Sequence, residues 1–240
     1  MLKKLSLLFL SLLLGAIVIL FGWYQIDGIA TTETENFLYS EDFILTEEPD
    51  GSLLFSPMAD NGHGIVIMHG AVIMPKSYAK SAAYFAQQGY TVYLPYGPAR
   101  LSLYAVDQTA ARLESLDVEE WFFIGHSMGG LSSLELLSKH AIDVQAIALW
   151  AASIPSDFSD VDTPILLIVG NKDGMIPPAR LERNLKNLPE STRLVTLKGA
   201  NHKNFAMYSH QFFDNDATIG WMEQIDFANQ TTGDFFAELR

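Results

Sequence analysis

The stretch Trp121-Phe-Phe-Ile-Gly125-His-Ser127-Met-Gly129 decides the fold of this chain. Four apolar residues, typical of a buried strand, run directly into a G-x-S-x-G pattern, and residues 131–140 continue with helical spacing. A serine on a tight strand-to-helix turn needs small neighbours, and the turn holds its hydroxyl exposed at the end of the strand. The alternative interpretation is an ordinary glycine-rich helix cap. Because an apolar strand precedes the pattern, we interpret Ser127 as a nucleophile, with the Met128 N–H at the helix start facing a developing oxyanion.

Short apolar strands alternate with helical segments on both sides of this stretch. Residues 36–45 and 52–57 alternate in polarity around a Glu-Glu-Pro-Asp-Gly turn, which predicts a hairpin. Wholly apolar strands that alternate with helices are typical of a parallel sheet covered on both faces. We therefore predict an α/β fold with a mostly parallel sheet of about eight strands flanked by helices. The pattern places the remaining strands at 64–68, 90–94, 121–124, 144–151, 164–169 and 193–197, and the helices at 78–88, 103–116, 131–140, 179–188 and 218–239.

The N-terminal segment has a different character from the rest of the chain. Residues 5–26 carry no charge and are nearly all apolar. About 20 residues at about 1.5 Å each give roughly 30 Å of helix, which is the thickness of a bilayer core. Lys3 and Lys4 precede the run and Asp27 follows it, so the positive end is expected to stay in the cytoplasm. The sequence therefore predicts an N-terminal transmembrane helix.

Three regions follow from this assignment. We expect a membrane anchor or signal segment over residues 1–26, a linker over 27–35 and one catalytic domain over 36–240. An uncleaved anchor would keep the protein at the membrane with this domain outside the cytoplasm. A signal peptide cleaved after Ala30 is the alternative, and it would give a secreted protein.

Composition excludes several classes of function. The 240 residues are 49% hydrophobic and 18% charged, which suits one folded domain. The absence of cysteine excludes disulfides, a thiol nucleophile and cysteine-ligated zinc. A net charge of −13 without a basic cluster argues against nucleic acid as a partner. We find no metal-ligand spacing and no dinucleotide or phosphate-binding glycine loop, so we expect neither a metal nor a cofactor. The oligomeric state is left open.

A serine nucleophile needs a base, and the base needs an acid that orients it. In the architecture that carries the G-x-S-x-G turn, the order along the chain is Ser, then Asp or Glu, then His. Asp173 lies in turn residues just after the strand at 164–169. Asp160 and Asp162 could compete, but they precede this strand and should lie at the opposite edge of the sheet. We therefore predict Asp173 as the acid.

Only two histidines follow Asp173 in the chain. His202 lies just after the strand at 193–197, in Lys198-Gly-Ala-Asn-His202. No strand leads into His210, which we expect at the surface. We therefore predict His202 as the general base.

The loop His69-Gly70-Ala71 follows the strand at 64–68. Acyl transfer needs a second N–H donor from such a loop, beside the donor that follows the nucleophile. We predict the Ala71 and Met128 N–H groups as the oxyanion hole. His69 and His126 are expected to pack and form hydrogen bonds rather than to act in catalysis.

These motifs resemble a known family. The chain is similar to a compact member of the α/β-hydrolase superfamily, and in particular to the group called α/β-hydrolase family 5, which is related to the dienelactone hydrolases. The resemblance implies Ser127, Asp173 and His202 as a triad, with Ala71 and Met128 as oxyanion donors. The motifs that carry it are His69-Gly70, Leu94-Pro95 with residues 101–107, Gly125-His-Ser-Met-Gly129, Gly170-Asn-Lys-Asp173, Gly199-Ala-Asn-His202 and residues 214–220.

Two positions depart from that group. Ala71 stands where the group commonly has a third glycine, but its backbone N–H is retained. The nucleophile is serine, whereas the dienelactone hydrolases use cysteine, so dienelactone chemistry itself is not expected. The connection at 152–163 is too short for a lid domain.

The resulting functional prediction is a serine hydrolase of the carboxylesterase type, which cleaves a small-molecule ester through an acyl-enzyme. Two alternatives stay open. The chain could be an extracytoplasmic acyltransferase that passes the acyl group to a hydroxyl other than water. It could also be a binding module without catalysis, since a fold does not determine a function.

Overall fold

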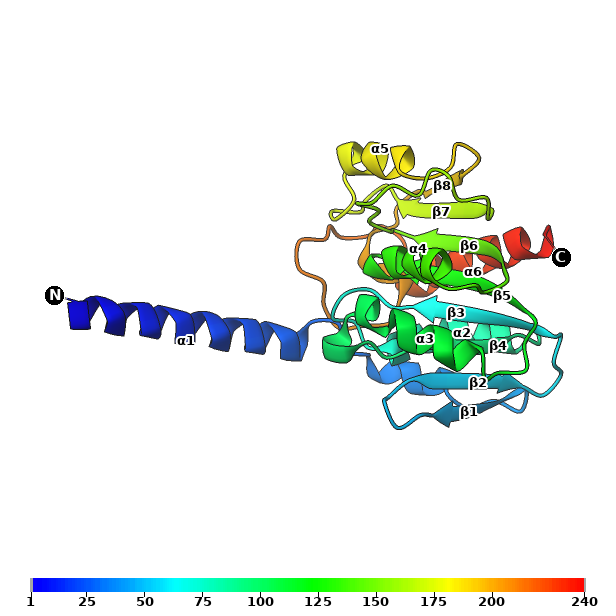
Figure 1. The fold of residues 1–240 in the computed structure, drawn as a ribbon, viewed down its shortest axis with the longest axis horizontal. Helices are drawn as coiled ribbons and strands as arrows, with labels where there is room; N and C mark the ends of the chain where they lie inside the picture. Colours follow the sequence, from blue (N-terminus) through cyan, green and yellow to red (C-terminus); the bar gives the residue numbers. More distant parts are fainter. Residues whose placement is uncertain (1, 240) are drawn as a thin grey trace.

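The computed structural model describes residues 2–239, apart from the side chains of residues 2–8, 11, 17, 19 and 20. It shows one eight-stranded sheet covered by helices on both faces, with a single helix projecting from one edge (Figure 1). The helices are α1 (Leu2–Ile26), α2 (Ala79–Ala86), α3 (Val106–Leu113), α4 (Met128–Lys139), α5 (Pro178–Lys186) and α6 (Trp221–Ala237). The strands are β1 (Phe43–Glu47), β2 (Leu53–Pro57), β3 (His63–Met68), β4 (Thr91–Leu94), β5 (Glu120–His126), β6 (Val144–Trp150), β7 (Ile165–Gly170) and β8 (Arg193–Leu197).

The strand order is β1-β2-β4-β3-β5-β6-β7-β8. Only β2 runs against its neighbours, pairing antiparallel with β1 and β4, and every other pair is parallel. The predicted mostly parallel sheet of about eight strands, flanked by helices, is confirmed. Because parallel strands share one carboxyl edge, the loops after β3, β5, β7 and β8 meet at the same side of the molecule.

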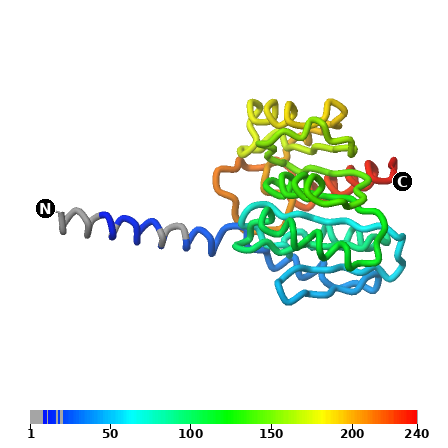
Figure 2. The backbone as a smooth tube through the Cα atoms, viewed as in Figure 1, coloured from blue at the N-terminus to red at the C-terminus, as the bar shows by residue number. Residues whose placement is uncertain are grey.

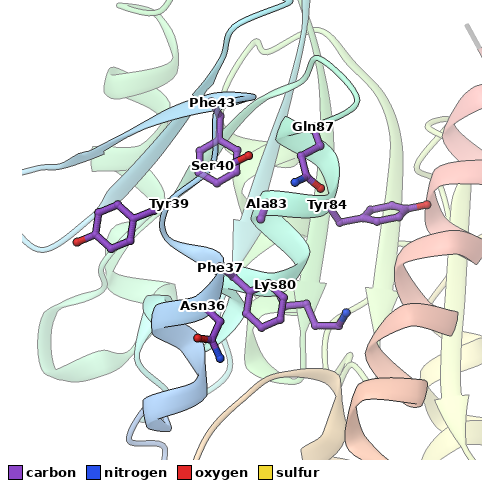
Figure 3. A pocket seen from close by; sticks show the side chains of 9 residues that line it. All are labelled: Asn36, Phe37, Tyr39, Ser40, Phe43, Lys80, Ala83, Tyr84 and Gln87. Carbon is purple, nitrogen blue, oxygen red and sulfur yellow. The ribbon is translucent and has the colours of Figure 1, made fainter.

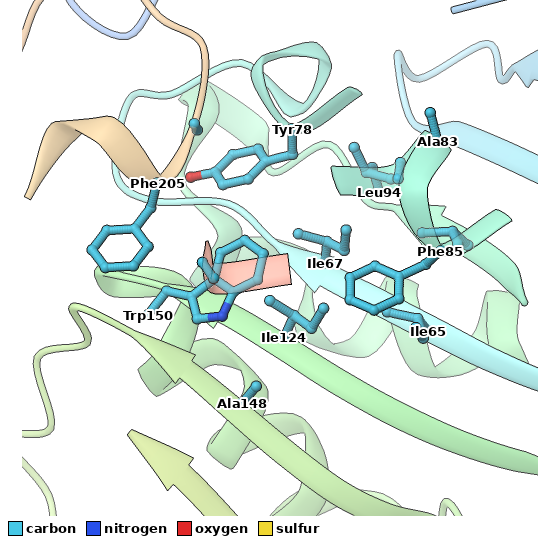
Figure 4. Close-up of a cluster of buried hydrophobic side chains, with 14 of the residues drawn as sticks. Ile65, Ile67, Tyr78, Ala83, Phe85, Leu94, Ile124, Ala148, Trp150 and Phe205 are labelled. Atoms are coloured by element: carbon cyan, nitrogen blue, oxygen red, sulfur yellow. The ribbon is translucent and has the colours of Figure 1, made fainter. Parts of the chain in front are cut away.

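Two hydrophobic cores lie on the two faces of this sheet, because successive residues of a strand point to opposite faces. Ile65 and Ile67 of β3 pack into one core with α2 and α6, as Figure 4 shows for part of that cluster. Val66 and Met68 of the same strand pack into the other core with α3, α4 and α5. Burying each side chain of this size contributes about 1.5–3 kcal/mol. The central strands are covered on both faces, which explains their unbroken apolar sequence.

Helix α1 leaves the domain at the carboxyl edge of the parallel strands (Figures 1 and 2). Among the residues described, no helix has the length and apolar character that a membrane crossing needs. The helix predicted at the N-terminus therefore forms, but the prediction that it spans a membrane is not supported.

The first strand is shorter than predicted. The sequence pattern predicts a strand from residue 36, whereas β1 begins at Phe43 and Thr32–Phe37 form a 3-10 helix. Leu38 follows that helix and is buried in the core on the α2 side, so an irregular segment rather than a strand carries its side chain inward. Tertiary burial here outweighs a local alternation of polarity.

Candidate active site

Ser127 lies on the sharp turn between β5 and α4. Its backbone has φ 54° and ψ −116°, a left-handed φ that costs energy for any residue except glycine. Close packing holds the turn in this shape. A Cβ added at Gly129 would lie 1.9 Å from the Met68 carbonyl oxygen, and one at Gly125 would lie 2.4 Å from the Gly129 oxygen. The small residues on both sides of Ser127 are therefore required by contact with β3 and with the helix.

The structure brings the predicted nucleophile, base and acid together. Ser127 Oγ lies 2.9 Å from His202 Nε2, and His202 Nδ1 lies 2.9 Å from Asp173 Oδ2. The His202 and Asp173 side chains are almost fully buried, 2% and 0% exposed. The carboxylate accepts the proton on Nδ1, which leaves Nε2 free to accept the serine proton. This arrangement can activate a hydroxyl for nucleophilic attack.

Backbone hydrogen bonds hold the carboxylate of Asp173. Its Oδ1 accepts from the Met175 and Ile176 N–H groups, each at 2.7 Å, while Oδ2 faces His202. Asp173 follows β7 and so lies at its carboxyl edge. Asp160 and Asp162, the competing candidates, precede β7 and are not among the partners of His202. Neither is brought to the triad.

Asp214 is a residue that sequence reasoning missed. Its Oδ1 accepts from the Gly174 N–H at 2.9 Å, and its Oδ2 accepts from the Lys203 N–H at 2.8 Å. These are the residues directly after Asp173 and His202. The Asp214 carboxylate therefore connects the loop that carries Asp173 to the loop that carries His202. No sequence signal separates it from an ordinary loop aspartate, although the motif at 214–220 includes it.

The loop after β3 lies against the nucleophile. A Cβ added at Gly70 would lie 3.4 Å from Ser127 Cβ. Val72 has φ 56°, and its N–H donates to the Arg100 carbonyl at 2.7 Å, which holds the loop in a strained shape. In the described part of the chain, neither the Ala71 nor the Met128 N–H donates to a protein acceptor. Neither donor is therefore used in a hydrogen bond within the described part of the chain.

Two buried histidines border the site. His69 Nδ1 donates to the Gly70 carbonyl at 2.8 Å and its Nε2 accepts from the Gly97 N–H at 3.2 Å, so its ring joins two loops. Burial lowers the pKa of His69 to about 4. Burial, followed by the neighbouring His202, lowers the pKa of His126 well below 6.5. Both rings are neutral at physiological pH. The remaining candidate, His210, is half exposed and lies 3.5 Å from Asp27 rather than beside the triad.

One cavity of the structure borders the nucleophile turn, and two others lie near β1. The loop after β3 and the loop after β4 border a cavity of about 210 Å³ that includes Met74 and Tyr96. A second cavity of about 370 Å³ includes Ser153, whose N–H donates to the Ser127 carbonyl at 3.3 Å. A third of about 280 Å³ lies away from the triad (Figure 3), lined by Asn36, Phe37, Tyr39, Ser40, Phe43, Lys80, Ala83, Tyr84 and Gln87. Within the described residues, no three His, Asp or Glu side chains are grouped as a metal ion would need.

Comparisons with known proteins identify the family and agree with the fold. A model of the alpha/beta hydrolase family matches residues 64–226. A CIB-like hydrolase from Thermoplasma acidophilum is 22% identical with a TM-score of 0.57, over 78% of this chain and 99% of that one. A lidless α/β serine hydrolase from Xanthomonas campestris is 18% identical with a TM-score of 0.51, over 69% and 88%. Naproxen esterase from Bacillus subtilis is 15% identical with a TM-score of 0.60, over 85% and 94%. A search of curated protein sequences found no match. At these identities the structural likeness shows the fold alone.

Proposed function

Since this chain belongs to the alpha/beta hydrolase family, we propose that it is a serine hydrolase that cleaves carboxylic esters of small molecules. The observation that carries the proposal is the continuous hydrogen-bond chain from Ser127 Oγ through His202 to Asp173. The Ala71 and Met128 N–H groups, which donate to no acceptor in the described part of the chain, support it, because acyl transfer needs donors for the developing oxyanion.

The proposed mechanism is acyl transfer to water. Ser127 Oγ attacks the ester carbonyl while His202 Nε2 takes its proton, and Asp173 stabilises the imidazolium that forms. The Ala71 and Met128 N–H groups bind the tetrahedral oxyanion, where losing one donor would raise the barrier by about 3 kcal/mol. His202 then protonates the leaving alcohol. A water molecule, deprotonated by His202, releases the carboxylic acid and restores Ser127.

The surroundings of Ser127 favour small or medium-sized esters. The segment between β6 and β7, residues 151–164, contains no inserted domain that would cover the site. Long-chain lipids would need a longer apolar channel, so short acyl groups are the proposed substrates.

The decisive experiment uses the full-length chain and its Ser127→Ala variant. We expect the wild-type protein to react with a fluorophosphonate probe and to hydrolyse p-nitrophenyl acetate and butyrate. Ser127→Ala should lose labelling and roughly 10⁵–10⁶-fold in kcat, because the hydroxyl forms the covalent intermediate. Ser138→Ala, at an exposed serine of the helix α4 that follows Ser127, is the matched control and should keep both activities.

Two outcomes would contradict the proposal. Turnover retained in Ser127→Ala would remove Ser127 from the mechanism, and a wild-type chain that neither labels nor hydrolyses any ester would favour a binding module. Product analysis with an added alcohol tests the remaining alternative. A new ester as the main product would indicate an acyltransferase.

We also propose that the folded domain lies outside the cytoplasm. The support is the sequence alone, because Lys3 and Lys4 precede the uncharged segment at 5–26 and acidic residues follow it. A C-terminal tag on the expressed chain should be digested by protease added to intact spheroplasts. A tag that is digested only after lysis would contradict this location.

A further inference from the structure

A tyrosine and a histidine are buried together directly behind the catalytic residues. Tyr78 ends the 3-10 helix Pro75–Tyr78 and is 1% exposed, and His126 ends β5 and is fully buried. In Figure 4 the Tyr78 hydroxyl points away from the aliphatic side chains of the cluster, toward the side where Phe205 lies. Burying polar groups costs free energy unless they are hydrogen-bonded. The hydrogen-bond partners of Tyr78 and His126 therefore indicate which parts of the site this pair connects.

The pair belongs to a chain of three buried hydrogen bonds. The Gly70 N–H donates to Tyr78 Oη at 3.0 Å. Tyr78 Oη lies 2.7 Å from His126 Nδ1, and His126 Nε2 lies 3.0 Å from the His202 carbonyl oxygen. We call this set the buried bond chain. It begins in the loop that carries Ala71 and ends on the backbone of the base.

The two ends of the buried bond chain and the neutral state of His126 together determine the direction of its bonds. A carbonyl can only accept, so His126 Nε2 must carry the proton that bonds to His202. Because burial makes the His126 ring neutral, its Nδ1 carries no proton and accepts from the Tyr78 hydroxyl. Tyr78 Oη in turn accepts from the Gly70 N–H, and His126 is in the Nε2–H tautomer. Burial keeps its pKa well below 6.5, which preserves this state at working pH.

Ring packing adds a second contact between His126 and the base. The His126 and His202 ring centroids are 5.1 Å apart, and the His126 and Phe205 centroids are 5.7 Å apart. His126 therefore touches the imidazole of His202 and bonds to its backbone. His126 also directly precedes Ser127 in the sequence, so it is linked to the nucleophile through the backbone and to the base through these contacts.

We propose that Tyr78 and His126 are positioning residues that set the distance between the oxyanion loop and the catalytic base. This inference rests on the proposed function of Ser127, His202 and Asp173. Neither side chain touches the ester in this role. The buried bond chain connects the loop of Gly70, the turn at His126 and the loop of His202. In this arrangement the oxyanion donors and His202 Nε2 act on the same carbonyl. We expect a loss of this arrangement to lower the reaction rate more than it weakens substrate binding.

The first test is Tyr78→Phe, which removes only the hydroxyl. We expect kcat to fall about tenfold or more with KM changed less than about twofold, because the lost bonds act on geometry rather than on the bound ester. Tyr93→Phe is the matched control, a buried tyrosine in the core on the opposite face of the sheet, and it should leave kcat unchanged. A Tyr78→Phe variant with wild-type kcat would overturn the proposal.

The second test separates the two bonds of His126. In His126→Gln the amide nitrogen reaches the position of Nε2 and can still donate to the His202 carbonyl. In His126→Asn the amide oxygen takes the position of Nδ1 and keeps only the bond from Tyr78. We expect His126→Gln to retain a several-fold higher kcat than His126→Asn. Equal losses in both variants would mean that the bond to His202 does not position the base.

The third test does not depend on activity. Nitrogen NMR of isotope-labelled histidines should show His126 with a protonated Nε2 and a bare Nδ1 in the wild-type chain, and a mixture of tautomers in Tyr78→Phe. A bare Nε2 in the wild type would refute the buried bond chain, even if the protein is a working esterase. Absence of Ser127-dependent turnover would instead refute the proposed function and the kinetic role built on it.

Discussion

Among single residues, His69 and His126 show how burial controls charge at this site. Both rings are fully buried, and desolvation of the charged form lowers the pKa of each. Their neutral forms use one ring nitrogen as a donor and the other as an acceptor, which lets each ring join two loops. A protonated His69 ring would have two donors and no acceptor, so its bond from the Gly97 N–H would be lost. A protonated His126 would reverse its bond with the Tyr78 hydroxyl. The integrity of the site therefore depends on these rings staying neutral.

This dependence predicts acid sensitivity of the fold. The pKa of His69 is about 4 when folded and about 6.5 when unfolded, so the unfolded chain binds more protons between these values. The stability is complete above pH 6.5 and falls as the pH drops toward 4, by roughly 3 kcal/mol for His69 alone. Urea unfolding between pH 7.5 and 4.5 should show the decline. His69→Gln should reduce the slope and His210→Gln should not, whereas parallel curves for His69→Gln and wild type would contradict the assignment.

Among the elements, the junction of β5 and α4 is the most tightly packed part of the site. The helix begins directly after Ser127, and its second residue, Gly129, lies against the backbone of β3. This contact presses the nucleophile turn onto the strand that ends in the oxyanion loop. The shape of the turn is therefore a property of two elements in contact rather than of five residues alone.

Two glycine-to-alanine variants test that packing. Gly129→Ala would place a Cβ 1.9 Å from the Met68 oxygen, so the backbone must move, and we expect a loss of more than about 3 kcal/mol in the free energy of unfolding. Gly233→Ala, in the interior of α6, meets its nearest atom at an ordinary 3.5 Å. It should stabilise the protein by about 0.5–1 kcal/mol through helix propensity. Urea unfolding measures both, and similar values for the two variants would contradict the packing argument.

At the scale of the whole molecule, the chain that leaves α1 is built into the active-site loops. The Gly28 carbonyl accepts from the Met74 N–H at 2.9 Å, and the Ile29 carbonyl accepts from the Ser209 N–H at 2.8 Å. The buried Arg100 donates to the Asp27 carbonyl at 3.0 Å and to the Tyr24 carbonyl, with its guanidinium 3.7 Å from the centre of the Tyr24 ring. Cleavage after Ala30 would remove all of these contacts.

Arg100→Met tests this connection. The variant keeps an unbranched side chain but loses the donors at the end of α1, and we expect it to lower the free energy of unfolding by roughly 2 kcal/mol. The junction around Tyr24 should also be cut faster by chymotrypsin. Arg193→Met removes an exposed ion pair with Glu238 and should cost less than about 1 kcal/mol. Unchanged proteolysis in Arg100→Met would show that the junction does not depend on the guanidinium.

The predicted fold agreed with the structure where the pattern was strongest. Wholly apolar strands and the helices between them appear where predicted. A strand buried on both faces of a sheet needs apolar residues at every position, and this pattern can be read from the sequence. The predicted strand over residues 36–42 was wrong, because the alternation of polarity there is weak and the burial of Leu38 determines the conformation of the segment. The predicted membrane span also failed to find support in the described residues.

The sequence by itself determined the α/β class, the strand-to-helix turn that carries Ser127, and the candidate acid and base by their places after strands. These follow from hydrophobic periodicity and from small residues at a tight turn, which are local properties. Only the tertiary structure decided that Ser127 and His202, 75 residues apart, lie within a hydrogen bond, and that Tyr78, His126 and Asp214 tie the site together. Such contacts join loops distant in the chain, and they depend on strand order and close packing, which no local pattern encodes.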